Sequence, residues 1–308
     1  MKEEVEKTTE KEDILWEYCE TANRYIMNRL KNSPTILRWI SVGVITVLAI
    51  TALSCDGDIK GSEKRVERLM LIRLRTGVPE EKRKELLRRL TALNTSLRSV
   101  SRYLKAEYGF QNSKEGLDSG FEIGVRISFA SVHDRDYFDG KTSLTGTFDP
   151  MYGELLQFMT PLLAPDCGFF NFDFIPEGKA FKTELTKGER LDHLVFFRFR
   201  KNITDLEKQE VIRRFLELKN SLKEGKPYIR FIEYGYENDK SAVDMGFDIV
   251  FRVGFSSEAD RDYYVGKPFL TDSGKFDPMH DAFKNFVSSY LDHSGGALVF
   301  DYQVVNPL

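Results

Sequence analysis

The sequence predicts an α+β protein of two tandem ferredoxin-like β-α-β-β-α-β repeats, paired as a pseudo-dimer of the dimeric α/β-barrel type. The main observation is internal repetition, because Glu107-Tyr108-Gly109 recurs as Glu233-Tyr234-Gly235 and Asp134-Arg135-Asp136-Tyr137 recurs as Asp260-Arg261-Asp262-Tyr263. The offset of about 126 residues indicates a duplicated domain, since solenoid repeats run roughly 20–50 residues. Differences between the two copies then indicate which of them has kept a site.

Each copy is expected to open with a strand and a helix. Residues 68–74 and 193–199 are apolar on both faces, which is typical of a strand buried on both sides. Thr204 and Glu207 form a capping box for one helix, and Pro79 suits the first turn of the other. The helices are expected to bury an apolar stripe, made of Leu86, Leu90, Leu93 and Leu97 in the first copy and Val211, Phe215, Leu218 and Leu222 in the second.

The middle of each copy is expected to hold two strands. A short strand ends at the Glu-Tyr-Gly motif, and the next strand alternates strictly between apolar and other residues over 121–129 and 247–255. We expect Gly109, Gly120, Gly235 and Gly246 to serve turns at strand ends.

The last part of each copy is expected to hold helical turns and a closing strand. Ser131 and Ser257 can each start a short helical turn, and an Asp-Pro pair can start a second helix at Asp149 and at Asp277. The closing strands are expected at residues 169–174 and 298–304. A four-stranded sheet of this order has helices on one face only, so the apolar second face of each copy can be buried against the other copy.

The organisation predicted along the chain has six parts. They are a charged N-terminal segment (1–35), a transmembrane helix (36–54), a tether (55–65), the first repeat (66–175), a linker (176–190) and the second repeat (191–308).

The composition excludes several function classes. The formal net charge of −3 gives no basic footprint for nucleic acid, and we expect no nucleic-acid partner. There is no Gly-rich phosphate loop, no cluster of metal-ligand spacing and no Gly-x-Ser-x-Gly nucleophile motif, so we expect no cofactor and no metal. The three cysteines are isolated, and Cys167 is expected to be a buried or idle thiol.

Residues 36–54 differ from the rest of the chain because Arg38 is their only charged residue. A spanning helix needs about 20 apolar residues, and Trp39 suits the membrane interface. We expect a single-pass membrane anchor, whose orientation stays open because basic residues flank both ends. A buried core helix, a signal peptide and a lipoprotein anchored at Cys55 are the alternatives.

The two repeats, and the second most clearly, resemble the stress-responsive A/B barrel (Dabb) family. The resemblance spans roughly residues 66–305, and its motifs are His193 before an apolar strand, Gly246-Phe247, Arg261-Asp262-Tyr263, His280 at a helix start, and Val299-Phe300-Asp301-Tyr302. It implies the dimeric α+β barrel fold. The chain departs from the family pattern in the longer stretch 266–276, and the first copy has Arg68 and Tyr152 where the second has His193 and His280.

The resemblance also implies a candidate site in the second repeat only, because some family members are aldol-type cyclases that use Tyr and His. The corresponding residues are Tyr263 (or the adjacent Tyr264), His280 and His193. A histidine can remove a proton next to a carbonyl, and a tyrosine hydroxyl can stabilise the resulting enolate. The alternative is that all three are structural residues. For Tyr263 this alternative is favoured, because the first copy has Tyr137 at the equivalent position but lacks the two histidines.

Two functions follow from this reading. The leading expectation is a membrane-anchored Dabb protein with a binding or stress-protective role, whose repeats pair with each other and take a small apolar ligand. The alternative is a small cyclase-like enzyme acting on a carbonyl or polyketide-like substrate. A pocket that reaches both His280 and Tyr263 would favour the enzyme, whereas an interior filled by side chains would favour the binding or structural role.

Overall fold

The computed structural model describes residues 64–141, 149–178, 190–239, 243–268, 270–272 and 274–305, and these confirm the predicted fold class. In the first repeat, β1 (Val66–Ile72), β4 (Leu104–Phe110), β5 (Ile123–Phe129) and β6 (Phe169–Phe174) form an antiparallel sheet of order β4-β5-β1-β6. Its helices are α3 (Glu80–Ala92), α4 (Val132–Phe138) and α5 (Pro150–Met159). A two-residue hairpin follows α3, formed by β2 (Leu97–Arg98) and β3 (Ser101–Arg102).

The second repeat has the same elements in the same order. Its strands β7 (Leu191–Phe197), β10 (Phe231–Tyr236), β11 (Ile249–Phe255) and β12 (Ala297–Gln303) form an antiparallel sheet of order β10-β11-β7-β12. Its helices are α6 (Asp205–Glu217), α7 (Glu258–Val265) and α8 (Pro278–Val287), and its small hairpin is β8 (Leu222–Lys223) with β9 (Lys226–Pro227). Each repeat is therefore a ferredoxin-like unit in which α4 or α7 precedes the second long helix.

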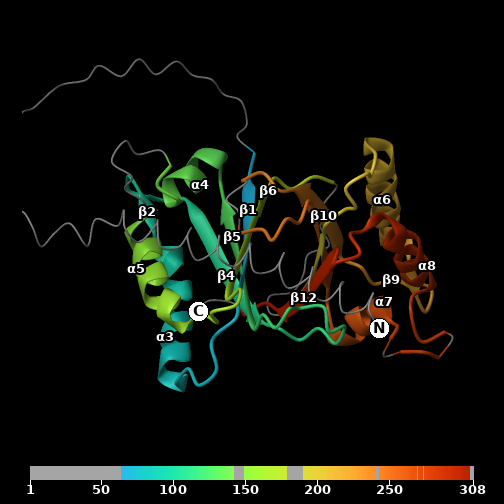
Figure 1. Cartoon of the computed structure of the whole chain (residues 1–308), viewed down its shortest axis with the longest axis horizontal. Helices are drawn as coiled ribbons and strands as arrows, with labels where there is room; N and C mark the ends of the chain where they lie inside the picture. Colours follow the sequence, from blue (N-terminus) through green and yellow to red (C-terminus); the bar gives the residue numbers. More distant parts are fainter. Residues whose placement is uncertain are drawn as a thin grey trace, which may run out of the picture.

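The two sheets face each other at the centre of the molecule, with α3 and α5 outside one sheet and α6 and α8 outside the other (Figure 1). Aromatic side chains from both repeats fill the space between the sheets. The ring of Phe196 lies 4.9 Å from that of Phe170 and 5.3 Å from that of Phe172, between ring centroids, and none of the three is exposed. Each repeat therefore covers the open sheet face of the other, as the apolar pattern predicts.

The edges of the two sheets also meet, so the eight strands close toward a barrel. Isolated bridges join Tyr108 to Val305 along one seam and Glu177 to Tyr234 along the other. Gly109 lies inside β4, where an added Cβ would come within 2.4 Å of the Gln303 carbonyl oxygen; Gly235 lies at the equivalent place in β10. The expectation that these two glycines serve turns is therefore wrong, because they allow two backbones to approach closely. Gly120 and Gly246 do occupy turns, with φ of +76° and +72°.

The helix starts follow the sequence closely. The Thr204–Glu207 capping box is present, and Ser131, Ser257, Asp149 and Asp277 all cap their helices. The helix ends differ from the prediction. Helices α3 and α6 end in short 3-10 turns, and the last residue of each predicted apolar stripe lies beyond that turn. Leu97 and Leu222 lie in the small hairpins and are 55% and 49% exposed, so their assignment to the buried stripes is wrong.

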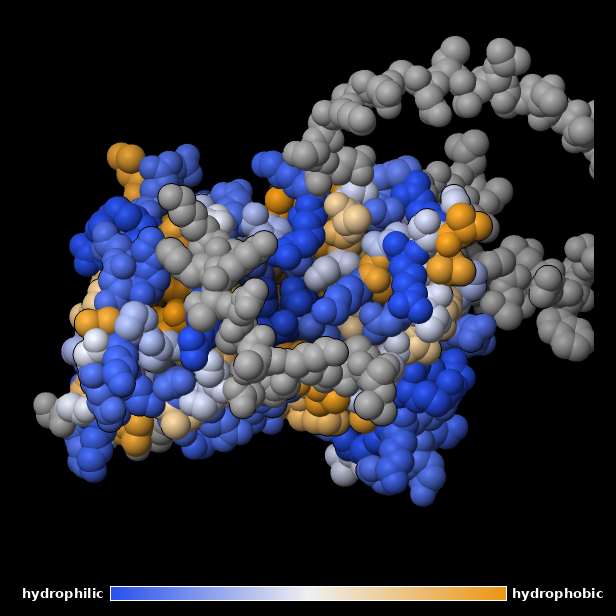
Figure 2. Space-filling view, turned by 180° about the vertical axis from the view of Figure 1, so that it is seen from behind, coloured by the Kyte–Doolittle hydropathy of each residue, from blue (hydrophilic) through white to orange (hydrophobic). Residues whose placement is uncertain are grey.

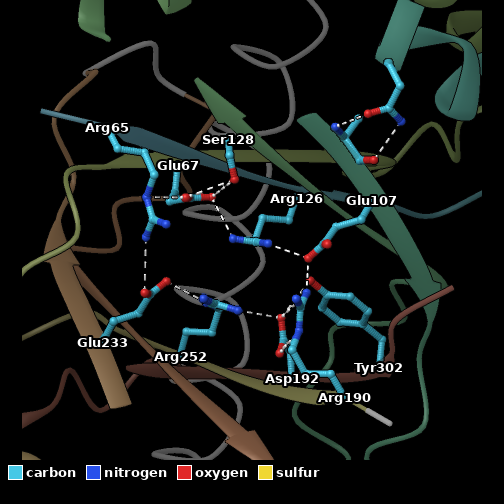
Figure 3. Close-up of polar contacts among 12 residues, drawn as sticks. Arg65, Glu67, Glu107, Arg126, Ser128, Arg190, Asp192, Glu233, Arg252 and Tyr302 are labelled. Carbon is cyan, nitrogen blue, oxygen red and sulfur yellow. Dashed lines mark hydrogen bonds and ion pairs between the residues drawn. The ribbon is translucent and has the colours of Figure 1, made fainter. Parts of the chain in front are cut away.

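A network of buried ions crosses the centre between the two sheets (Figure 3). In the first repeat, Arg126 pairs with Glu107 at 2.6 Å and with Glu67 at 3.1 Å. In the second repeat, Arg252 pairs with Glu233 at 2.7 Å and with Asp192 at 2.9 Å.

The residue that precedes the first strand of each repeat links the two halves of this network. Arg65 reaches Glu233 at 3.4 Å, and Arg190 reaches Glu107 (Figure 3). Four arginines and four carboxylates thus form a charge-balanced network with the pseudo-two-fold symmetry of the fold. The prediction of an apolar interface omitted these charges.

On the face seen in Figure 2, hydrophilic residues predominate and apolar residues show only in scattered patches.

Cys167 is buried as expected, but its sulfur is disulfide-bonded, so it is not an idle thiol. Within the described ranges no helix combines the length and apolarity needed to cross a bilayer, and the predicted anchor at 36–54 lies outside those ranges.

Candidate functional site

A cavity of about 170 Å³ lies in the second repeat, between the outer face of the sheet and helices α6 and α8. His193 on β7 and His280 on α8 both line it, although 87 residues of sequence separate them. The remaining polar lining comes from Glu115, Lys284 and Ser288. The walls are mostly apolar, and include Val195, Phe197, Phe215, Phe283 and Val299. An apolar pocket with a few converging polar groups is the usual form of a small-molecule site.

His193 is 1% exposed and is held by the carboxylate of Asp301 on the neighbouring strand β12. Its Nδ1 lies 2.6 Å from Oδ1 of Asp301, whose other oxygen accepts a 2.5 Å hydrogen bond from Nη1 of Arg261. Burial alone would lower the pKa of His193, but the charge and hydrogen bond of Asp301 and the charge of Glu115 raise it above its usual value. These interactions favour the protonated form of His193, in which both ring nitrogens are hydrogen-bond donors.

His280 has the opposite character. It is 5% exposed, and its Nδ1 donates a 2.6 Å hydrogen bond to the backbone carbonyl of Tyr264. Burial lowers its pKa well below the usual value, and the positive charges of Lys284 and His193 lower it further. His280 is thus a neutral imidazole whose Nε2 carries a lone pair. The side chain is buried although it lies in the first turn of α8, because α8 packs it against Tyr264 of α7.

Tyr264, and not Tyr263, is the tyrosine beside the two histidines. Its ring stacks on that of His280 at 3.8 Å and meets that of His193 edge-on at 5.4 Å, and burial raises its pKa well above the usual value. Tyr263 is partly exposed, contacts Tyr228, and donates to the carbonyl of Leu222. Successive residues of a helix point about 100° apart, so only one of the pair on α7 can face the sheet. Of the two tyrosines that the resemblance offers, Tyr264 is therefore the one that contacts the histidines, and neither of the two lines the cavity.

Two charged residues of the cavity, Lys284 and Glu115, were not predicted from the sequence. Lys284 lies on α8 one turn beyond His280, and its Nζ donates to the backbone carbonyls of Val265 and Lys267, each at 2.7 Å. The spacing of four residues from His280 is a signal that could have indicated it. Glu115 comes from the first repeat, and no pattern within the second repeat could have indicated it.

The cavity lies within a segment that a family model covers. Residues 191–304 match the Stress responsive A/B Barrel Domain. The match covers the second repeat, where both histidines lie, and confirms the resemblance for that part of the chain. No curated protein matches the chain.

Several solved structures resemble the second repeat or both repeats together. An Arabidopsis thaliana protein is 20% identical over 38% of this chain and 96% of its own, with a TM-score of 0.31. A hydroxynitrile lyase from Passiflora edulis is 19% identical over 39% and 95%, with a TM-score of 0.29. A chlorite dismutase variant from Candidatus Nitrospira defluvii is 6% identical over 80% of this chain and 93% of its own, with a TM-score of 0.42.

The first repeat contains the same scaffold as the second repeat, but an ion cluster occupies the place of the two histidines. Arg68 replaces His193 and is fully buried between Asp139 at 2.6 Å and Asp173 at 2.7 Å. Tyr152 replaces His280 and stacks on Phe138 with 4.1 Å between centroids, much as His280 stacks on Tyr264. A guanidinium held by two carboxylates stays charged and cannot exchange a proton near neutral pH. The pair of titratable histidines is therefore confined to the second repeat.

Asp139 and Asp173 also meet Asp239 of the second repeat, and oxygens of the three lie within 4.8 Å of one another. Such a cluster could hold a cation, but it already has partners. Besides Arg68, Arg135 pairs with Asp173 at 3.0 Å, and Lys141 pairs with Asp239 at 2.5 Å. Three cations thus balance three carboxylates, and the cluster serves as an ion-pair link between the repeats.

Proposed function

We propose that the second repeat binds a small single-ring carbonyl compound and moves a proton on the carbon next to its carbonyl. The observation that carries this proposal is the pair of histidines at one cavity, whose environments push their pKa values in opposite directions. Groups separated in this way are suited to the acid and base roles of one reaction. The cavity reaches His280 but not Tyr263, so the pocket expected of an enzyme is present only in part. The preference for the enzyme over the binding role rests on the pair of histidines at one cavity.

The cavity size supports a ligand of about one ring. An engineered protein cavity of about 150 Å³ holds a benzene molecule, so about 170 Å³ suits one ring with a small substituent. The apolar walls supply the binding free energy, since burial of apolar surface contributes about 25 cal/mol per Å².

The proton transfer then follows from the two imidazoles. Nε2 of His280 accepts the proton of the carbon next to the carbonyl. The electron pair of that C–H bond forms the C=C double bond of an enolate, and the π pair of the carbonyl moves onto its oxygen. Nε2–H of protonated His193 donates to that oxygen and stabilises the developing negative charge. Return of the proton from His280 regenerates the ligand and the enzyme.

Acetophenone, which has one ring and an exchangeable methyl group beside its carbonyl, tests this proposal. In D₂O the protein should accelerate loss of the methyl proton signal in ¹H NMR. His280→Ala should reduce this rate by about 10²–10⁴-fold, which is the usual contribution of a general base. Tyr152→Phe, at the equivalent position of the first repeat, is the matched control and should keep the rate. Unchanged exchange in the His280→Ala protein would show that this residue is not the base, and binding without any exchange would favour the binding role.

We also propose that residues 36–54 anchor the chain in a membrane, on the strength of their length and low charge. Deletion of residues 1–60 should move the protein from the membrane fraction to the soluble fraction, because the apolar run is removed. The full-length chain should stay with membranes after an alkaline carbonate wash. Release of the full-length chain by that wash would contradict an integral anchor.

A further inference from the structure

Glu115 belongs to the first repeat but lines the cavity of the second. The loop that carries it, residues 111–120 between β4 and β5, is held against the second repeat on both sides of this residue. Asn112 accepts a 3.0 Å hydrogen bond from Nη1 of Arg261, and Lys114 pairs with Asp262 at 2.8 Å. Beyond Glu115, the Leu117 carbonyl accepts a 3.0 Å hydrogen bond from the amide of Val299 on β12. The position of Glu115 is thus fixed by contacts that cross between the repeats.

The carboxyl group of Glu115 is incompletely satisfied. Its Oε1 is buried and has no hydrogen-bond partner in the part of the chain that the structure describes. Burial raises the pKa of Glu115, and Asp301 adds to this, while the positive charges of His193, Lys284 and Arg261 oppose it. A buried polar atom without a partner destabilises the folded state, because it has given up its hydrogen bonds to water without replacing them.

The equivalent loop of the second repeat shows the contrast. There Asn238 accepts a 3.2 Å hydrogen bond from Arg135, just as Asn112 accepts one from Arg261. The nearby carboxylate of Asp239, however, pairs with Lys141 at 2.5 Å. The loop exchange is therefore common to both repeats, whereas the unsatisfied carboxyl oxygen faces the one cavity that contains the histidines.

We propose that Glu115 binds a hydroxyl group of the ligand, which makes this cavity a composite site that selects hydroxylated single-ring carbonyl compounds. A hydroxyl group fits because it both donates and accepts, so it matches a carboxyl group in either protonation state. The ligand would lie with its carbonyl at the histidines and its hydroxyl at Glu115. This inference rests on the proposed function and adds a specificity-determining residue to it.

The test compares acetophenone with 3-hydroxyacetophenone and 4-hydroxyacetophenone by isothermal titration calorimetry on the full-length chain. The wild-type protein should bind the better hydroxylated isomer at least about tenfold more tightly than acetophenone, because a site with an unpaired polar group discriminates against a ligand that leaves it unpaired. Glu115→Met, which is similar in size but apolar, should reduce this preference to about threefold or less. Glu154→Met is the matched control, because it makes the same substitution at a glutamate of α5 that is 65% exposed and does not line the cavity, and it should keep the preference.

Thermal melting of the ligand-free proteins supplies an independent readout. Glu115→Met should raise the melting temperature, because it removes a buried polar atom that has no partner. A lower melting temperature would show that the carboxyl group has a structural role and would overturn the inference. Binding of the rings with a preference unchanged by Glu115→Met would also overturn it while leaving the proposed function intact. Failure of the wild-type protein to bind any of the three rings would overturn both.

Discussion

Replacing Phe196 by alanine is expected to lower the free energy of unfolding by about 3–5 kcal/mol, the usual cost of removing a buried phenylalanine ring. Phe196 lies on β7 of the second repeat, is not exposed, and packs against Phe170 and Phe172 of the first repeat. The cavity left between two rigid sheets cannot collapse easily, because the strands are fixed by pairing on both sides. Denaturant unfolding followed by circular dichroism measures this change.

Phe110→Ala is the matched control, because that ring is 48% exposed at the end of β4. It should change the free energy of unfolding by no more than about 0.5 kcal/mol, as surface substitutions usually do. Similar costs for the two variants would contradict the packing of the two repeats through their sheet faces. A stability loss of about 4 kcal/mol is a large fraction of the 5–15 kcal/mol typical of a folded protein.

Replacing Arg252 by methionine is expected to destabilise the protein by about 3–5 kcal/mol near neutral pH, because it leaves Glu233 and Asp192 buried without their main cation. Arg213→Met is the control, since Arg213 is 53% exposed and pairs with Glu210 and Glu217 on a helix surface. Such exposed pairs contribute about 0–1 kcal/mol. Urea unfolding of both variants measures the difference.

The pH dependence of the Arg252→Met effect follows from the carboxylates. Burial alone would raise the pKa values of Glu233 and Asp192, but the charge of Arg252 lowers both below their usual range. A carboxylate whose pKa is lowered by folding stabilises the folded state at any pH above its pKa in the unfolded chain, which is about 4. This stabilisation is lost as the pH falls through the pKa of the carboxylate in the folded state. The cost of Arg252→Met should therefore shrink below about pH 4, when the stranded carboxylates take up protons. A cost that stayed constant down to pH 3 would show that lost packing, and not lost charge pairing, causes the destabilisation.

The double variant Arg252→Met with Glu233→Gln separates these causes further. It removes one of the two stranded charges, so it should be more stable than Arg252→Met alone. Arg190 still pairs with Asp192 at 2.9 Å in that variant, which limits the remaining cost. A double variant that was less stable than the single one would indicate that Glu233 contributes through contacts other than Arg252.

The fold could be predicted from the sequence because its signals are local. The period-two strands, the Thr204–Glu207 capping box and the Asp–Pro helix starts each depend on residues a few positions apart. The duplication then extended each assignment to the other copy. The wrong assignments are those of Leu97 and Leu222. Both continue the apolar spacing of a helix, but each lies in a small exposed hairpin that follows the end of that helix.

The candidate site could be predicted only in part. Comparison of the copies and the family resemblance selected His193 and His280, and the structure places both at one cavity. The choice between Tyr263 and Tyr264 depends on the rotation of α7 about its axis, which its short polar sequence leaves open. The buried ion network was not predicted, although Glu107, Arg126, Glu233 and Arg252 recur at equivalent positions within apolar strands.

The sequence by itself determined the duplication, the order of the elements and the restriction of the two histidines to the second copy, because repetition and periodicity are properties of the chain. Only the tertiary structure decided the opposite pKa shifts of His193 and His280, since these arise from Asp301, burial and neighbouring charges. It also decided that Glu115 of the first repeat meets the cavity of the second. That contact depends on how the two sheets pack face to face, which brings a loop of one copy over the helices of the other.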